Sequence, residues 1–129
     1  MNVSLKLDPR KKLATWEQIK AKRDELEASP IQLFNGNVYD YNERTELRLQ
    51  KALKGFDSLR SVQENGGMLP WKLSNNEWYL HTKEEFQQVV NDIDLEIAKR
   101  SDELFARAEQ LAANPPTVED LELLSTWFI

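Results

Sequence analysis

The side chains in this sequence that could carry acid–base or metal chemistry are either few or do not occur at the spacing of a known site. His81 is the only histidine and cysteine is absent, which excludes disulfides, thiolate catalysis and cysteine-based zinc sites. Carboxylates are numerous between residues 84 and 109, where Asp92 and Glu96 stand four positions apart and could share one helix face. No histidine follows them at the spacing used by carboxylate-bridged iron sites. We therefore interpret these carboxylates as a solvated acidic face, and His81 as a turn residue or surface donor.

Composition narrows the function further. The four glycines form no phosphate-binding loop, and no nucleophile-elbow motif is present, so we expect neither a catalytic residue nor a cofactor. The chain has 17 Lys and Arg against 22 Asp and Glu, and this net charge of -5 argues against a general nucleic-acid binder. It also has no apolar run of the roughly 18 residues that a membrane span needs, and no signal segment opens it. A partner, if there is one, is expected to be a protein.

Apolar residues near the two ends are the candidates for contact with such a partner. Two aromatic residues stand among the last three positions, where a chain end is difficult to bury. Near the start, apolar residues alternate at period two before Asp8-Pro9, which indicates either a frayed terminus or an arm that adds a strand to a neighbouring sheet or chain. The candidate partner-binding residues are Val3, Leu5, Leu7, Leu124, Trp127 and Phe128.

The first half of the chain predicts a helix, a hairpin and a second helix. Thr15 and Gln18 form a capping box, and the helix that they open should stop by Ser29. A hairpin over residues 31–41 follows, with its turn centred on either Asn35-Gly36 or Gly36-Asn37. A helix from about residue 43 to residue 56 comes next, and the sequence QENGG at residues 63–67 indicates a loop.

The second hairpin, over residues 69–81, has a more definite predicted register. A two-residue turn at Asn75-Asn76 would pair Leu73 with Trp78 and Trp71 with Leu80. Those four side chains would then share one face, with polar residues on the other. We expect both indoles to anchor the core.

One long helix is predicted in the C-terminal half. It begins at the capping pair Thr82 and Glu85 and meets no glycine or proline from Lys83 to about Ala113, a length of roughly 46 Å. Its heptad-like apolar seam either packs within the chain or forms a coiled coil with other copies, and Arg100 on the seam favours packing within the chain. A last cap at Thr117 opens a short apolar helix that runs to the terminus.

Together these elements predict an α+β fold. Small antiparallel hairpins pack with helices, and one long helix in the C-terminal half dominates. The expected organisation is an N-terminal arm at residues 1–14, an α+β domain at residues 15–113 and a C-terminal amphipathic helix at residues 114–129.

The pattern from residue 16 to residue 113 resembles an uncharacterised domain of tailed bacteriophages. The resemblance is carried by RDEL at residues 23–26, FNGNVYDY at residues 34–41, Arg44 with the Leu-rich helix that follows it, and PWKLSNNEWYLHT at residues 70–82. The family occurs in phage tail and tail-fibre proteins and in short tail-fibre assembly proteins. The arm and the segment from Asn114 onward lie outside the match, and the resemblance carries over no functional residue.

The resemblance implies a non-enzymatic tail component that docks on tail or tail-fibre proteins in the virion, after assembly in the host cytoplasm. An assembly chaperone released before the virion is complete is the first alternative, and a carboxylate-metal enzyme using Asp92 and Glu96 is the second. The resemblance also leaves open whether the chain forms a homo-oligomer. It implies no cofactor.

Overall fold

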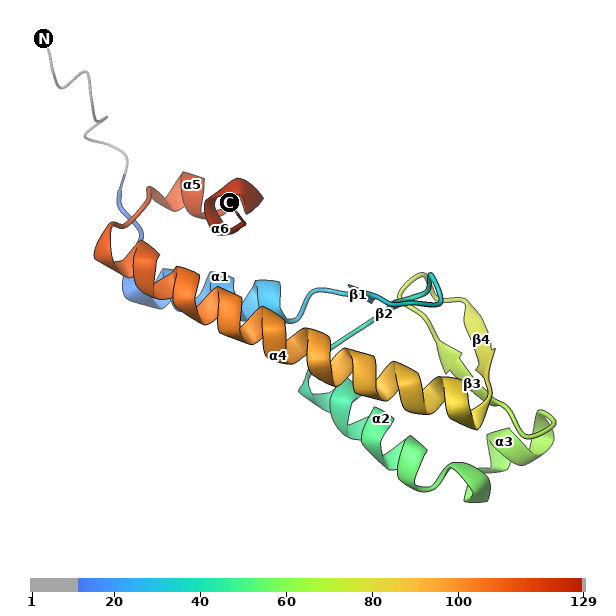
Figure 1. Cartoon of the computed structure of the whole chain (residues 1–129). Helices are drawn as coiled ribbons and strands as arrows, with labels where there is room; N and C mark the ends of the chain where they lie inside the picture. The colour runs from blue at the N-terminus through green and yellow to red at the C-terminus, as the bar shows by residue number, and fades with distance from the viewer. Residues whose placement is uncertain (1–11, 129) are drawn as a thin grey trace, which may run out of the picture. The chain divides into compact units, whose positions relative to one another are not determined.

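A computed structural model describes residues 12–128 and confirms the α+β class (Figure 1). The predicted arm residues Val3, Leu5 and Leu7 lie outside the described residues. In chain order the elements are α1 (Trp16–Glu27), β1 (Ile31–Gln32), β2 (Val38–Tyr39), α2 (Glu43–Lys54), the 3-10 turn η2 (Phe56–Ser58), α3 (Arg60–Glu64), β3 (Leu69–Lys72), β4 (Trp78–His81), α4 (Lys83–Ala113), α5 (Val118–Leu121) and α6 (Leu124–Trp127).

The chain forms two compact units. One combines the segment up to Glu27 with the segment from Arg100 onward, and the other spans residues 28–99. This division differs from the expected boundaries at residues 14 and 113, because the C-terminal segment belongs to the same unit as α1. The long helix α4 contributes residues to both units.

The predicted helix starts and the predicted length of α4 are confirmed. The Thr15 hydroxyl accepts from the Gln18 amide at 3.2 Å, and the Gln18 side chain accepts from the Thr15 amide at 2.9 Å. Thr82 likewise accepts from the Glu85 amide at 3.1 Å. The apolar seam of α4 is buried within the chain, in one core that includes Phe86 and another that includes Leu104.

The register of the second hairpin differs from the prediction. Lys72 pairs with Trp78, and Trp71 pairs with Tyr79. The turn is centred on Ser74-Asn75, because the Asn76 amide donates to the Leu73 carbonyl at 2.9 Å and the Leu73 amide donates to Glu77 at 2.8 Å. Asn76 then takes the left-handed φ of 69° that such a bulged loop requires.

This shift of one residue turns β4 over. Because neighbouring strand residues point to opposite faces, the inward side chains of β4 are Tyr79 and His81, and the outward ones are Trp78 and Leu80. Trp78 is therefore 67% exposed, and the expectation that it anchors the core is wrong. Trp71 is half-buried and packs against Phe86 with the two rings tilted, at 5.4 Å between ring centroids.

The first hairpin uses the same loop, so neither of its predicted turn centres is correct. The Gly36 amide donates to the Leu33 carbonyl at 2.9 Å, which centres the turn on Phe34-Asn35. Gly36 has a φ of 80°, a conformation that glycine adopts without strain. One backbone hydrogen bond joins the two hairpins, from the Ser74 amide to the Val38 carbonyl at 2.9 Å.

A single core fills the unit of residues 28–99. It includes the inward residues of both hairpins, one face of α2 and the first turns of α4. The predicted second helix ends at Lys54, and Phe56 joins this core from η2. The predicted loop at residues 63–67 begins two residues too early, because α3 extends to Glu64. The buried members are Ile31, Tyr39, Leu49, Phe56, Val62, Leu69, Leu73, Phe86, Val89, Val90 and Ile93.

The other unit joins the two ends of the described chain. The Ala14 amide donates to the Pro116 carbonyl at 2.7 Å, and the Val118 amide donates to the Lys12 carbonyl at 2.9 Å. In place of one C-terminal helix there are two short ones, α5 and α6, which break at Glu122 and Leu123. The core of this unit contains Ala14, Ile19, Leu26, Leu104, Ala108, Leu111, Leu121 and Trp127.

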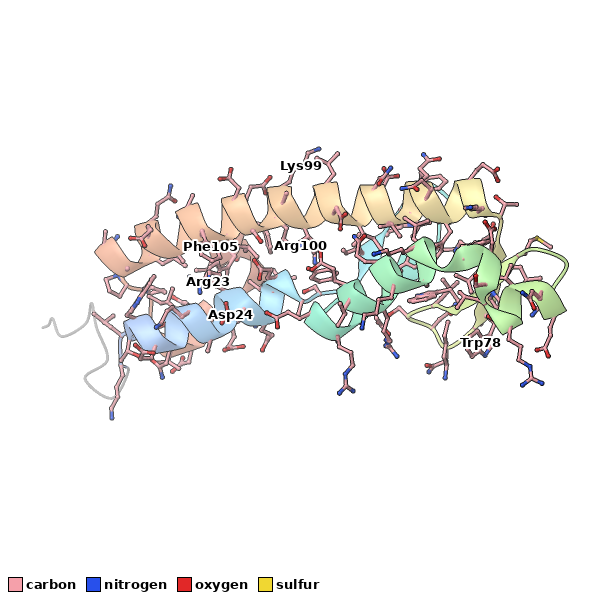
Figure 2. The ribbon with its side chains drawn as sticks, turned by 90° about the horizontal axis from the view of Figure 1, so that it is seen from below. Arg23, Asp24, Trp78, Lys99, Arg100 and Phe105 are labelled. Carbon is pink, nitrogen blue, oxygen red and sulfur yellow. The ribbon has the colours of Figure 1, made fainter. Side chains whose placement is uncertain are left out.

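Two cationic side chains of α1 hold the same unit together. Arg23 lies over the ring of Phe105 at 4.0 Å from its centroid, as Figure 2 shows. Lys22 is 9% exposed and donates to Glu25 at 2.6 Å and to Glu122 of the segment after α5 at 3.0 Å. The hydrogen bond with Glu25, and to a smaller extent that with Glu122, raises the pKa of Lys22 above its usual value and keeps the side chain charged.

Candidate functional site

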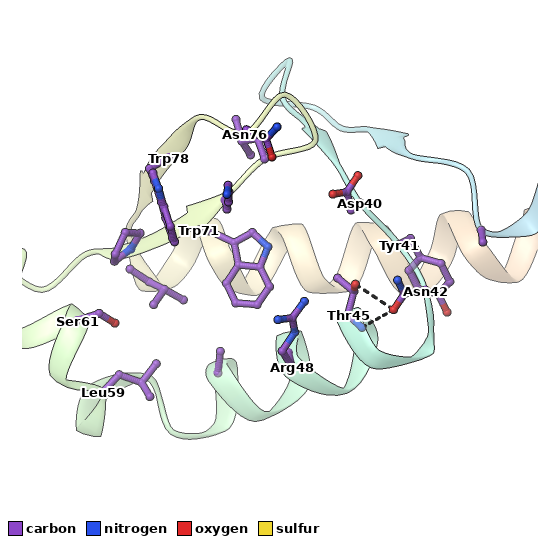
Figure 3. Close-up of a pocket in the computed structure, with 16 residues that line it drawn as sticks. Asp40, Tyr41, Asn42, Thr45, Arg48, Leu59, Ser61, Trp71, Asn76 and Trp78 are labelled. Atoms are coloured by element: carbon purple, nitrogen blue, oxygen red, sulfur yellow. Dashed lines mark hydrogen bonds between the residues drawn. The ribbon is translucent and has the colours of Figure 1, made fainter.

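A groove of about 650 Å³, within the size range of ligand sites, runs along β3 (Figure 3). We name it the β3 groove. Its walls are β3, the face of α2 that carries Thr45 and Arg48, and the connection from β2 to α2. It is lined by Ala28, Asp40, Tyr41, Asn42, Thr45, Arg48, Ala52, Leu59, Ser61, Leu69, Pro70, Trp71, Lys72, Leu73, Asn76 and Trp78.

Two indoles form the aromatic part of the groove. Trp71 is held in place by its contact with Phe86, whereas Trp78 lies on the outward face of the hairpin beside Lys72. Figure 3 shows both side chains lining the groove from neighbouring strands. An indole that is 67% exposed leaves most of its apolar surface in water, so contact with a ligand would remove that surface from water.

Some polar side chains of the groove already serve the fold. Asn42 caps α2, since its Oδ1 accepts from the Thr45 amide at 2.9 Å and from the Thr45 hydroxyl at 3.2 Å. The charged side chains differ from this pair. Asp40, Arg48 and Lys72 are exposed, and none has a hydrogen bond or ion pair with another residue of the described range 12–128. These three charges are available to a ligand.

His81 lies outside the groove and is fully buried, which corrects its interpretation as a turn or surface residue. Its Nδ1 lies 3.3 Å from the Leu69 carbonyl oxygen, so that nitrogen carries the hydrogen. Its Nε2 lies 2.7 Å from the Tyr39 hydroxyl and accepts from it. Burial is the main cause that lowers the pKa of His81 below 6.5. The ring is therefore neutral and fully hydrogen-bonded, which is the arrangement of a structural histidine.

The network around His81 continues to the first turn of α4. Asn35 donates to the Tyr39 hydroxyl at 2.9 Å and to Glu85 at 3.3 Å, and Tyr79 donates to the same carboxylate at 3.1 Å. Burial raises the pKa of Tyr39, and the hydrogen bond to Glu85 raises the pKa of Tyr79. Both phenols stay protonated and act as donors that tie the hairpins to α4.

The acidic face of α4 shows no assembled metal site. Within residues 12–128, no group of three or more histidine, cysteine, aspartate or glutamate side chains is arranged to hold a metal ion. Asp92 is half-buried and Glu96 is exposed. Asp94 accepts from Gln50 at 3.1 Å, an ordinary surface contact. None of the helices that the structure describes combines the length and apolar character needed to cross a membrane.

The predicted partner-binding residues at the C-terminus separate into two kinds. Leu124 is 61% exposed and Phe128 is 50% exposed, so both have surface to offer. Trp127 is 3% exposed and its Nε1 donates to the Leu121 carbonyl at 3.1 Å, which makes it a core residue. The end of the chain buries this indole by folding back over the core of its unit.

Sequence reasoning missed the β3 groove because it assigned Trp71 and Trp78 together to the core. The signal that could have found it is the likeness of the two hairpin loops. LFNGN at residues 33–37 and LSNNE at residues 73–77 carry leucine and asparagine at matching places, and glycine in the first marks the position that needs a left-handed φ.

Comparison with known proteins gives one family. A family model described as "Domain of unknown function (DUF4376)" matches residues 10–124, which is most of the chain. No curated protein and no solved structure matches.

Proposed function

This chain belongs to the DUF4376 family, and from that premise we propose that it is a non-enzymatic bacteriophage tail component that docks on other tail or tail-fibre proteins. The phage assignment is supported by the sequence resemblance described above. Docking as the activity is supported by the β3 groove. The virion tail is the proposed location, after assembly in the host cytoplasm.

One observation carries the docking proposal: the 67% exposure of Trp78 at the edge of the groove. Aromatic residues are enriched where proteins contact one another, because a large flat side chain gains much from burial and loses little conformational entropy. The indole here is supported from behind by a hairpin that is tied to the core through Tyr79 and His81. The groove therefore presents an exposed aromatic side chain on a backbone that is fixed to the core, which is suited to contact with another protein.

The test is to look for the polypeptide in purified virions by mass spectrometry. A fixed ratio to the major tail proteins is expected. Trp78→Ala should lower that ratio, whereas Leu95→Ala should leave it unchanged, since Leu95 is 56% exposed on α4 but does not line the groove.

The alternative of an assembly chaperone gives a different result. In that case the polypeptide would accompany tail or fibre subunits during assembly and be missing from finished particles. Absence from virions would overturn the proposal of a tail component, and unchanged incorporation of Trp78→Ala would overturn the role of the groove.

A further inference from the structure

The net charge of the β3 groove lining is opposite in sign to that of the chain. The whole sequence carries a net charge of -5, yet the groove lining contains Arg48 and Lys72 against the single acid Asp40. Neither cation has an ion pair within the described residues, although carboxylates are abundant in the chain. A local positive site on an acidic protein attracts an acidic ligand.

The rest of the groove lining combines apolar side chains with neutral polar ones. Its apolar lining includes Trp71 and Trp78 from the hairpin, Leu59 from the turn after η2, and Pro70 and Ala52. Asn42 and Thr45 bond to each other, whereas Ser61 and Asn76 also line the groove with neutral polar side chains. Two cations beside partly exposed apolar side chains suit a ligand in which apolar side chains alternate with carboxylates.

Backbone pairing with β3 is limited for such a ligand. The Leu73 amide donates to the Glu77 carbonyl, and from this pair onward hydrogen-bonded and non-hydrogen-bonded pairs alternate along the hairpin. By this alternation, Pro70 stands in a pair that is not hydrogen-bonded to β4. A backbone amide at that place would point away from β4 toward an added strand, and proline has none. Pro70 therefore removes one backbone donor that an added strand would use at the free edge of β3, and side chains contribute the larger part of recognition.

We propose that the β3 groove binds an extended acidic segment of the partner protein, with an apolar side chain against Trp78 and carboxylates on Arg48 and Lys72. This inference rests on the proposed docking function and states what the docked segment is. Guanidinium and ammonium groups at two places in the groove set the spacing of the carboxylates, and the Trp78 indole beside Lys72 provides the apolar contact.

The experiment is a fluorescence-anisotropy titration of the full chain with a labelled synthetic peptide. The probe alternates aspartate with leucine around one central phenylalanine, and a second probe replaces every aspartate with lysine. The acidic probe should bind and the basic one should not. The double variant Arg48→Glu, Lys72→Glu should weaken binding by about tenfold to a hundredfold, because it removes two charge-assisted hydrogen bonds.

A matched double variant controls for net charge. Arg44→Glu, Lys51→Glu makes the same charge change on exposed positions of α2 that do not line the groove, and it should leave the affinity within about twofold. Circular dichroism of both variants checks the fold. Equal losses in the two variants, equal binding of both probes, or no binding of the acidic probe would overturn the inference.

Two further experiments distinguish the acidic segment from a free anion and from docking that does not involve an acidic segment. Inorganic phosphate should not displace the probe, and if it did, the groove would hold a free anion and the segment would be the wrong ligand. Virions with Arg48→Glu, Lys72→Glu should lose the polypeptide as those with Trp78→Ala do. If only Trp78→Ala lowers incorporation, the result supports docking through the groove and overturns the proposal that the docked segment is acidic.

Discussion

At the scale of single residues, the two indoles of the second hairpin have different roles although they stand on paired strands. Trp71 fills space beside Phe86, and Trp78 faces solvent. We expect Trp78→Ala to change the free energy of unfolding by less than about 1 kcal/mol. Trp71→Ala, which removes a half-buried indole, should cost about 2–3 kcal/mol, below the range for full burial. Urea denaturation of both variants measures the difference.

The comparison between the two variants is the control, since both lose the same side chain from the same hairpin. A loss above about 2 kcal/mol for Trp78→Ala would show that its indole is buried, as the sequence first suggested. It would also remove the observation on which the groove is based.

His81 makes stability depend on pH in a defined direction. Burial lowers the pKa of the folded state below 6.5, so between the two pKa values the unfolded chain binds more protons than the folded one. Stability should therefore be constant above about pH 7.5 and fall as the pH drops below about 6.5, by at most about 1.4 kcal/mol per pH unit. Thermal or urea unfolding from pH 8 to pH 5.5 measures this slope.

The change of stability with pH, and not the absolute stability, shows whether His81 is the group that takes up the proton. In His81→Phe the neutral, aromatic character remains while the titration is lost, so the curve above pH 5.5 should flatten even if the variant is less stable. A slope of the same size in that variant would place the proton uptake on another group.

At the scale of elements, the sequence predicted helices better than hairpins, for a physical reason. Capping residues such as Thr15 and Thr82 act within one turn of the chain, so their spacing predicts their hydrogen bonds. A hairpin register depends on loop length, and a change of one residue moves every side chain to the other face. The alternation from Trp71 to Leu80 fits a two-residue turn, and the loop has three residues.

The two hairpins prove to be variants of one structure. Residues 30–42 and 70–82 match at a spacing of 40, with proline, leucine, asparagine and tyrosine at the same places, and each segment leads into a capped helix. In both loops an asparagine side chain accepts from the amide two residues on, Asn35 from Asn37 and Asn75 from Glu77, each at 3.0 Å. The turn is therefore set by these local bonds.

This likeness predicts the effect of exchanging residues between the loops. Gly36 and Asn76 occupy the same left-handed position, with φ of 80° and 69°. Asn76→Gly should be neutral or stabilising by a few tenths of a kcal/mol, whereas Gly36→Ala should cost about 1 kcal/mol from backbone strain. No atom lies within 4 Å of the added Cβ at Gly36, so a steric clash does not contribute.

Urea denaturation of Asn76→Gly and Gly36→Ala checks the loop conformation directly. Asn75→Ala serves as the companion variant, because it keeps the position with positive φ and removes only the side chain that accepts from Glu77. If Gly36→Ala were as stable as the parent chain, the turn would be centred elsewhere.

At the scale of the whole molecule, the sequence correctly predicted one long helix but did not indicate the contacts between the two ends of the described chain. Nothing local indicates that Lys12 and Ala14 bond to residues about 100 positions away, at Pro116 and Val118. These hydrogen bonds form only because the chain reverses direction after α4. Residue spacing alone does not show whether the folded chain offsets the entropy lost in closing so long a loop. Trp127 was assigned to a partner for the same reason.

The two units should respond separately when one core is damaged. Trp127 is 3% exposed in the core shared by α1 and the segment from Arg100, so Trp127→Ala should destabilise that unit by about 3–5 kcal/mol. Native-state hydrogen exchange should accelerate at the α1 amides and remain close to the parent rate at the hairpin amides of residues 28–99, because each compact unit has its own core. Leu124→Ala is the matched control, since that side chain is 61% exposed on the same short helix and should leave both rates unchanged. Equal acceleration in both units would show that the chain unfolds as one cooperative body, and no acceleration in α1 would show that the end of the chain does not cover this core.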